Sequence, residues 1–303
     1  MEDKIYRQFC RAAGEERVRV REPMRGHTTF RIGGPADYFI SPDTAEQLQE
    51  VLKICRETET PWFILGNGSN LLVSDQGYRG AVIQIYKNFQ KIEVQGEELQ
   101  AQAGALLSAI AARALAEELT GMEFASGIPG TLGGAVVMNA GAYGGEMKSI
   151  LKDALLLKPD GELCRLSAEE LELGYRTSRV KREGMIVLEA ALRLQKGSRD
   201  TIRARMEELK NQRCSKQPLE YPSAGSTFKR PEGYFAGKLI MDAGLRGFSV
   251  GGAQVSEKHC GFVINRGDAT AADVQALIRE IQERVWDQFQ VKLEPEIRFL
   301  GDF

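Results

Sequence analysis

Two glycine-rich segments in the first half of the chain constrain its fold more than any other feature. Residues 121–145 contain eight glycines and little charge, in a spacing too ordered for a linker. A shorter segment at 66–70, GNGSN, directly follows the apolar run WFIL. Glycine lets the backbone turn sharply and approach a ligand closely, and successive free N–H groups bind phosphate oxygens. The two segments therefore predict a diphosphate-containing ligand held largely by backbone groups.

Neither segment fits the common phosphate-binding motifs. The segment at 66–70 is not GxGxxG, and no phosphate-binding lysine follows it, which argues against a Rossmann fold and a P-loop. In the second, Pro129 and Gly130 suit the entry to a helix over 131–138, whose first turn would point N–H groups at a phosphate. Each segment also has an alternative interpretation that involves no ligand. Residues 66–70 could be a tight turn between strands, and the glycines at 127–134 could allow close helix packing.

The rest of the pattern predicts an α+β protein with a boundary near residue 197. Apolar spacing and composition predict helices over 44–58, 106–119, 199–213, 234–243 and about 20 residues from Thr270. Capping boxes are predicted at Thr44 with Gln47 and at Ser167 with Glu170, the second opening a short helix, and Thr270 with Asp273 opens the last helix. Alternating or apolar runs predict hairpins around Gly96 and 159–161, and strands in WFILG, LLVSD, AVIQIY, MIVLEAALRL and EPEIRFLG.

Charge and composition exclude several classes of function. The net charge of −2 creates no global attraction for nucleic acid or an anionic membrane. No apolar run approaches the roughly 20 residues of a membrane span, and the charged N-terminus lacks an apolar signal core. Five widely spaced cysteines without a CxxC pair, and only two histidines, argue against disulfides and a metal site. We therefore expect a cytoplasmic protein that binds no metal.

A family resemblance refines this picture. GNGSNLL at 66–72 and SGIPGTLGGAVVMNAGAYG at 126–144 resemble the FAD-binding segments of the vanillyl-alcohol-oxidase/PCMH flavoprotein fold. Together with HTTFRIGGPADYF at 27–39, they are similar nearly end to end to the UDP-N-acetylenolpyruvoylglucosamine reductase family, in its shorter type. The resemblance implies a PCMH-type FAD-binding domain at 1–197, with α+β subdomains at about 1–87 and 88–197. A smaller α+β substrate-binding domain follows at 198–303.

The resemblance also implies the cofactor and its binding residues. The first loop contains no Cys or His that would carry a covalent flavin, so we expect non-covalent FAD, reduced by NADPH. The expected cofactor-binding residues lie in the two glycine-rich segments: Gly66, Asn67, Gly68, Ser69, Asn70, Gly127, Ile128, Pro129, Gly130, Gly133, Gly134, Asn139, Gly141 and Ala142.

Three residues match the family's catalytic positions. Arg176 lies between two predicted strands, and its guanidinium fits carboxylates as a fork, although a solvated surface arginine is the alternative. The resemblance implies that it stabilises the developing enolate and carboxylate, with Tyr175 lining the substrate. From the sequence alone, Ser226 in the loop PSAGSTFK is a turn hydroxyl that bonds its own backbone. The resemblance implies that it is the proton donor to the substrate's α-carbon. Glu296 could be a solvated carboxylate at the edge of a strand. The resemblance implies instead that it is the glutamate that assists the proton transfer or orients a water or the substrate.

Local cations and amides are expected to bind the substrate, because the overall charge supplies no attraction for its phosphates. These assignments fall on Arg213, Lys216, Lys229, Lys238, Gln254 and Asn265. The family often has Asn where this chain has Arg230, so that residue is set aside. His259 is expected to be packed or hydrogen-bonded rather than reactive.

The expected function is NADPH-dependent reduction of UDP-N-acetylglucosamine enolpyruvate to UDP-N-acetylmuramate, a step of peptidoglycan synthesis that supports cell shape and division. The expected partners are these two small molecules, with no nucleic acid or membrane, and the chain is expected to be a monomer or weak homo-oligomer. An FAD-dependent oxidase or dehydrogenase of the same fold is the alternative. A non-catalytic nucleotide-binding module is a further one, although it leaves Arg176, Ser226 and Glu296 without a shared role.

Overall fold

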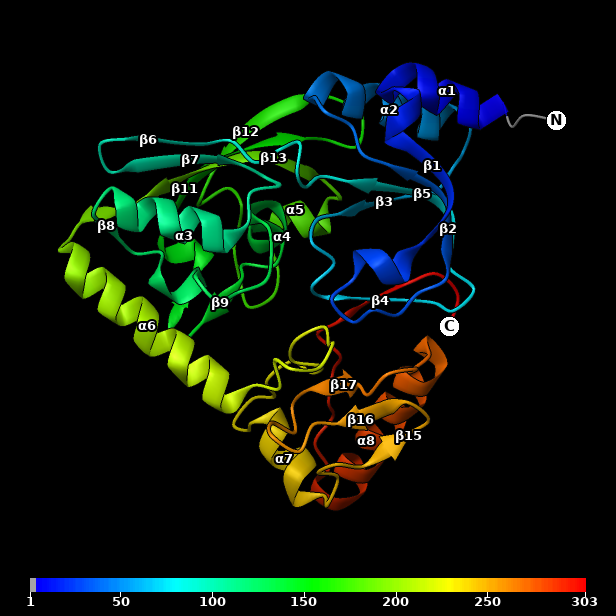
Figure 1. Ribbon diagram of the computed structural model, residues 1–303, viewed down its shortest axis with the longest axis vertical. Coiled ribbons are helices and arrows are strands. Elements are labelled where there is room, and N and C mark those ends of the chain that lie inside the picture. Colours follow the sequence, from blue (N-terminus) through cyan, green and yellow to red (C-terminus); the bar gives the residue numbers. More distant parts are fainter. Residues whose placement is uncertain (1–3) are drawn as a thin grey trace. The chain divides into compact units, whose positions relative to one another are not determined.

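The computed structural model describes residues 4–303, which form two compact units (Figure 1). Unit 1 comprises the chain up to Arg19 and residues 39–67 and 81–213, and unit 2 comprises 20–38, 68–80 and 214–303. The sequence-based division of function near residue 197 stays a prediction, because compactness and function need not divide a chain at the same place.

The chain alternates short strands with helices throughout, which confirms the predicted α+β class. The helices are α1 (Lys4–Ala13), α2 (Ala45–Glu57), α3 (Leu107–Ala116), α4 (Leu132–Val137), α5 (Arg179–Arg182), α6 (Arg199–Lys216), α7 (Ala236–Asp242) and α8 (Ala271–Phe289), with short 3-10 turns η1 (Glu15–Arg17), η2 (Met24–His27), η3 (Glu123–Ala125) and η4 (Met147–Ser149). The strands are β1 (Val18–Pro23), β2 (Pro35–Ile40), β3 (Trp62–Leu65), β4 (Leu71–Val73), β5 (Tyr78–Gln84), β6 (Ile92–Gln95), β7 (Glu98–Gln102), β8 (Leu119–Thr120), β9 (Gly141–Ala142), β10 (Gly145–Glu146), β11 (Leu151–Leu157), β12 (Leu163–Ser167), β13 (Ile186–Arg193), β14 (Gln195–Lys196), β15 (Ser249–Val250), β16 (Ala253–Val255), β17 (Val263–Asn265) and β18 (Arg298–Leu300).

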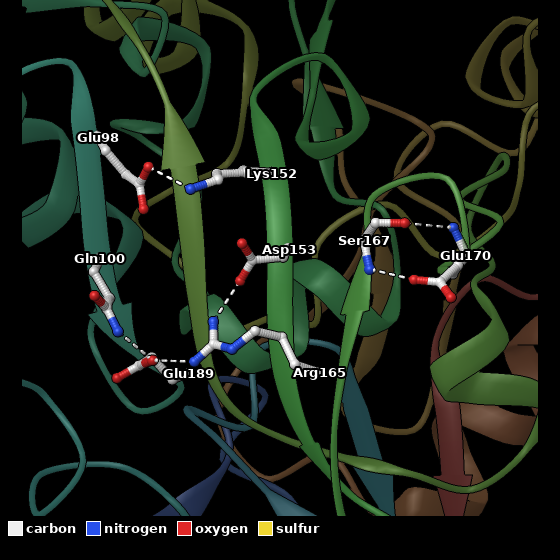
Figure 2. A network of polar contacts seen from close by, with 8 residues as sticks. All are labelled: Glu98, Gln100, Lys152, Asp153, Arg165, Ser167, Glu170 and Glu189. Carbon is white, nitrogen blue, oxygen red and sulfur yellow. Dashed lines mark hydrogen bonds and ion pairs between the residues drawn. The ribbon is translucent and has the colours of Figure 1, made fainter.

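The largest sheet of unit 1 is antiparallel, in the order β12-β11-β13-β7-β6. One face is covered, since α4 packs against β13 and β7 and lies on the same side as α3 in Figure 1. The other face carries a polar network: Lys152 pairs with Glu98 at 2.6 Å, and Arg165 bridges Asp153 and Glu189 (Figure 2). A sheet buried on one face and charged on the other resists a one-residue slip of register.

The predicted hairpins and most predicted helices of unit 1 are confirmed. Gly96 has φ +64° in the β6–β7 turn. Helix α2 begins after Thr44, whose side chain accepts from the Gln47 N–H at 3.2 Å, while the Gln47 side chain accepts from the Asp43 N–H instead of completing the predicted box. The described α3 ends at Ala116, because Glu118 has φ +57° and ends the helical path.

One predicted helix is absent from this part of the structure. Both capping-box bonds between Ser167 and Glu170 form, as Figure 2 shows, but residues 168–172 make only turns. Glu172 has φ +45°, a left-handed conformation that stops helix growth within one turn. The capping signal was therefore correct, and the helix prediction was wrong.

Unit 2 has its own core around α8. Thr270 and Asp273 form a full capping box, and the backbone N–H groups of Ala271 and Ala272 donate to the Asp75 carboxylate. The buried face of α8 packs with the three-stranded sheet β15-β16-β17 and with α7. β18 pairs in parallel with β4 and begins only at Arg298, three residues after Pro295, which has no N–H to donate to a ladder. Within residues 4–303, no helix is long and apolar enough to cross a membrane.

Candidate active site

The first half of the short glycine segment contacts the long one within unit 1. A Cβ built on Gly66 would lie 2.4 Å from Thr131 Oγ1, and Asn67 Nδ2 donates to the Pro129 carbonyl at 2.7 Å. Asn67 and Pro129 are 62 positions apart in the sequence. The structure therefore brings together parts of the two segments that were both predicted to bind the cofactor.

The second half of that segment belongs to unit 2. Gly68 has φ +62°, and a Cβ there would lie 2.1 Å from the His27 carbonyl oxygen. Asn70 Nδ2 donates to the Glu296 carbonyl at 3.2 Å, and the Arg298 N–H donates to the Asn70 carbonyl at 3.0 Å. Gly68 is thus required by packing, and Asn70 fixes the backbone that carries Glu296.

The glycines of the long segment divide into two kinds. At Gly133 a Cβ would lie 3.0 Å from Ala103 Cβ, and at Gly141 it would lie 2.7 Å from the Gly145 carbonyl oxygen, so packing explains both. Gly134 is exposed on α4, the helix that was predicted over 131–138. A Cβ built on Gly134 would have Thr131 Oγ1 as its nearest atom, at 3.8 Å. Nothing inside unit 1 requires a glycine there. The open space above this backbone fits the close approach of a flat or phosphate-bearing cofactor.

The remaining predicted cradle residues are placed around these loops. Arg213 packs on Gly127, where a Cβ would lie 3.1 Å from Arg213 Cδ, so this predicted substrate residue adjoins the cofactor segment. The Gly130 carbonyl accepts from the Leu107 N–H at 3.1 Å and thereby ties the loop to α3. Ser69, Ile128 and Ala142 are partly exposed in the loops themselves.

Asn139, a predicted cofactor residue, has several hydrogen-bond partners inside unit 1. Its side chain is buried, accepts from the Lys148 N–H at 2.9 Å, and donates to Glu146 Oε2 at 3.0 Å and to the Gly174 carbonyl at 3.1 Å. All three partners lie inside unit 1. The amide therefore braces the turn that carries Arg176, and its predicted contact with the cofactor stays a prediction.

Arg176 occupies a tight turn between β12 and β13. Gly174 and Thr177 exchange backbone bonds at 3.1 and 3.3 Å, so Tyr175 and Arg176 form a two-residue loop. Arg176 has φ +55°, which costs a non-glycine residue about 1–2 kcal/mol. Ser178, fully buried, donates to the Val137 carbonyl at 2.8 Å and fixes the end of this turn. The turn presents Tyr175, which is 55% exposed, with the Arg176 guanidinium 5.2 Å from its ring centre.

Ser226 and Glu296 lie on neighbouring segments of unit 2. The Glu296 N–H donates to the Thr227 carbonyl at 2.8 Å, and the Lys229 N–H donates to the Glu294 carbonyl at 2.9 Å. Phe228 and Pro295 form an antiparallel bridge between these bonds. The predicted last strand, EPEIRFLG at 294–301, was wrong at its start, since β18 begins at Arg298. The two predicted catalytic residues are nevertheless brought together, with Ser226 exposed.

The predicted substrate residues of unit 2 mostly have partners inside the protein. Lys229 Nζ pairs with Glu294 at 2.9 Å and, by this bond, lowers the pKa of that carboxyl. Lys238 pairs with Asp242 at 2.8 Å, and Gln254 donates to the Gly247 carbonyl at 3.0 Å. Lys216, the last residue of α6, is exposed. Their contacts with substrate remain predictions.

Asn265 has the most complete set of internal partners. It is 3% exposed, donates to the Phe30 carbonyl, and accepts from the Gly267 and Ala269 N–H groups. This arrangement gives the side chain a structural role, and its contact with substrate stays a prediction.

Sequence reasoning missed the residues that hold the loop carrying Ser226. Thr227 is 2% exposed, and its Oγ1 accepts from the Val263 N–H at 3.0 Å. Its position beside Ser226 in a loop rich in small residues was the only available signal. Within residues 4–303 no cluster of His, Cys, Asp or Glu side chains is arranged to hold a metal ion. All five cysteines carry free thiols, and burial raises the pKa of Cys55 to about 12.

Comparison with known proteins adds independent evidence. A family profile described as "FAD binding domain" matches residues 36–167, and one described as "UDP-N-acetylenolpyruvoylglucosamine reductase, C-terminal domain" matches residues 217–300. The UDP-N-acetylenolpyruvoylglucosamine reductase of Agathobacter rectalis is 57% identical, over 93% of this chain and 93% of its own length. That of Clostridioides difficile is 51% identical over 98% of both chains.

Solved structures agree with this likeness. The UDP-N-acetylenolpyruvylglucosamine reductase of Thermus caldophilus is 38% identical, with a TM-score of 0.81 over 94% of this chain and all of its own. The glucose dehydrogenase Phl p 4.0202 is 14% identical, with a TM-score of 0.52 over 65% of this chain and 45% of its own. The second likeness shows the fold alone.

Proposed function

The chain belongs to the UDP-N-acetylenolpyruvoylglucosamine reductase family, and on this premise we propose that Ser226, Glu296 and Arg176 are the residues with which it reduces its substrate. The reaction is the NADPH-dependent, FAD-mediated reduction of UDP-N-acetylglucosamine enolpyruvate to UDP-N-acetylmuramate. The sequence-based expectations of enzyme class, cofactor and electron donor are thereby confirmed. An oxidase of the same fold is not favoured, because relatives at 50% identity or more over nearly the whole chain carry the reductase name.

The residues present fit the cofactor. The joined loops at Gly66–Asn67 and Pro129–Thr131, together with the open backbone at Gly134, would hold FAD by main-chain groups. When bound, FAD takes a hydride from NADPH and supplies it to the substrate's carbon–carbon double bond. No Cys or His stands in the Gly66–Asn70 loop, so the association is non-covalent.

Ser226 is assigned the proton that completes the reduction. Adding a hydride to the terminal vinyl carbon leaves negative charge on the neighbouring carbon and its carboxylate, and one proton must then be added there. A hydroxyl is a weak acid in water, but it is strong enough for a carbanion held at hydrogen-bond distance. Ser226 is exposed, so its oxygen can regain a proton from solvent after each turnover.

Arg176 and Glu296 are assigned the developing charge and the orientation of this proton. The Arg176 guanidinium is permanently charged and matches a carboxylate or enolate oxygen pair. Its turn is fixed by Asn139 and Ser178, so the cost of its φ of +55° is met by the surrounding bonds. Glu296 is held by its own N–H on the Thr227 carbonyl, one residue from Ser226. This bond between the two segments is the observation that carries the proposal.

The test compares Ser226→Ala with Ser223→Ala, the same chemical change three residues earlier in the loop. Both purified variants should retain FAD and be reduced by NADPH at the wild-type rate. Turnover with the enolpyruvyl sugar should fall about 10²–10⁴-fold for Ser226→Ala only, the range expected for a lost general acid. Turnover of Ser226→Ala within threefold of wild type would remove Ser226 from the mechanism.

We also propose the setting in which the enzyme works. Reduction of a UDP-sugar precursor of peptidoglycan supports a cytoplasmic enzyme that acts upstream of the steps determining cell shape and division. A monomer or weak homo-oligomer with two small-molecule partners is consistent with this role.

A further inference from the structure

His259 occupies a tight turn between β16 and β17 in unit 2. Ser256 Oγ accepts from the N–H groups of Lys258 and His259 at 3.2 and 3.3 Å, and the Phe262 N–H donates to the His259 carbonyl at 2.9 Å. The imidazole Nδ1 accepts from the Gly261 N–H at 3.1 Å. The ring is thus an acceptor at Nδ1, which requires the neutral form with its proton on Nε2.

Two glycines and an aromatic ring surround the His259 imidazole closely. A Cβ on Gly261 would lie 2.9 Å from His259 Cε1, and a Cβ on Gly237 of α7 would lie 3.3 Å from the same atom. Phe262 meets the imidazole edge to face, with ring centres 5.0 Å apart. None of these three neighbours titrates. Two glycines and an aromatic ring leave room for a flat five-membered side chain and hold it in one orientation.

The peptide that the imidazole holds also holds the Ser226 loop. The Gly261 carbonyl accepts from the Thr227 N–H at 2.8 Å, and Thr227 Oγ1 accepts from the Val263 N–H at 3.0 Å. The Thr227 carbonyl in turn accepts from the Glu296 N–H at 2.8 Å. One residue, Thr227, therefore connects the turn of His259 with both proposed catalytic side chains.

We propose that His259 is a positioning residue that fixes Ser226 through Gly261 and Thr227. This inference rests on the proposed function, because it concerns the residue that donates the proton. The imidazole holds the Gly261 peptide, the Gly261 carbonyl holds the Thr227 amide, and the direction of the Ser226 side chain follows from the backbone next to it. Misplacement of a reacting group by about 1 Å costs on the order of 100-fold in rate.

The chemistry of the acceptor suggests matched variants. Asparagine places its Oδ1 where Nδ1 of histidine lies, so His259→Asn keeps an acceptor for the Gly261 N–H. Glutamine places its oxygen one bond further out, and His259→Gln loses that geometry. His259→Phe fills the space with no acceptor.

The experiment measures FAD-loaded wild type, these three variants and Ser226→Ala side by side. Reduction by NADPH should be unchanged in all of them. Turnover of the enolpyruvyl sugar should stay within about threefold for His259→Asn and fall about 10- to 100-fold for His259→Phe and His259→Gln. Amide hydrogen exchange at Gly261 and Thr227 should accelerate in the two slow variants and stay slow in His259→Asn.

The outcomes separate this inference from its premise. If His259→Gln turns over like His259→Asn, or if His259→Phe is as fast as wild type while Ser226→Ala is slow, His259 does not position Ser226 and the proposed function stands. If Ser226→Ala turns over normally, the proposed function itself fails. If His259→Phe does not fold, the comparison of His259→Asn with His259→Gln still decides.

Discussion

Replacing Gly134 should stabilise the protein while weakening its hold on FAD. Glycine within a helix costs about 0.5–1 kcal/mol relative to alanine, and the nearest atom to the added Cβ is 3.8 Å away. Gly134→Ala and Gly134→Leu should therefore raise the free energy of unfolding of the apoprotein by about 0.5–1 kcal/mol. If the open backbone faces the cofactor, the same side chains occupy its space. The dissociation constant of FAD should then rise at least about tenfold, equivalent to 1.4 kcal/mol, and more for leucine.

The neighbouring glycine provides the control. At Gly133 the added Cβ would lie 3.0 Å from Ala103 Cβ, so Gly133→Ala should lose the helix-propensity gain to crowding. Urea unfolding of the apoproteins measures the first effect, and fluorescence titration of the apoproteins with FAD measures the second. Wild-type FAD affinity in Gly134→Leu would show that the cofactor does not use this surface, and the cradle would have to be reassigned.

Three further predictions concern the bonds that hold the proposed catalytic residues. Thr227→Val should leave the Val263 N–H buried without an acceptor and lower the free energy of unfolding by about 1–3 kcal/mol, whereas Thr227→Ser should not; equal urea midpoints would contradict this. Asn139→Ala should lower turnover through the Arg176 turn with FAD content unchanged; loss of FAD with normal turnover of the loaded fraction would instead support the predicted cofactor contact. Burial lowers the pKa of His259 below its ordinary 6.5, so the unfolded chain binds a proton more readily and stability should fall as pH drops below about 6.5. His259→Asn should show a shallower fall between pH 7.5 and 5.5 in urea midpoints, and parallel curves would refute the link.

Local signals in the sequence were reliable where one segment decided its own structure. The helix at Thr44 and the long helix from Thr270 begin at their predicted caps, and the Gly96 hairpin has the left-handed turn that glycine favours. Two predictions, the helix after Ser167 and the start of the last strand, were wrong because other residues changed the path or the pairing of the chain. The Ser167 cap forms without a helix because the chain turns at Glu172. The last strand begins at Arg298 because residues 294–296 pair with residues 227–229 instead of with β4.

The proposed catalytic residues were predicted from family likeness, but the residues that hold them in place were not predicted. Ser226 and Glu296 are 70 positions apart, and only the folded chain shows that two backbone hydrogen bonds join their segments. Asn139 was predicted from its motif as a cofactor ligand, yet its amide hydrogen bonds all lie within unit 1. Side-chain partners of buried polar groups depend on long-range pairing, which no spacing rule in the sequence specifies.

The visible spectrum of the purified protein under anaerobic conditions is the sharpest test of the assigned cofactor, electron donor and substrate. We expect a flavin band that bleaches on addition of NADPH and returns on addition of UDP-N-acetylglucosamine enolpyruvate, with full recovery in wild type and slow recovery in Ser226→Ala. A band that bleaches but does not return with the enolpyruvyl sugar would contradict the assigned substrate. Absence of any flavin band after incubation with FAD would contradict the whole account.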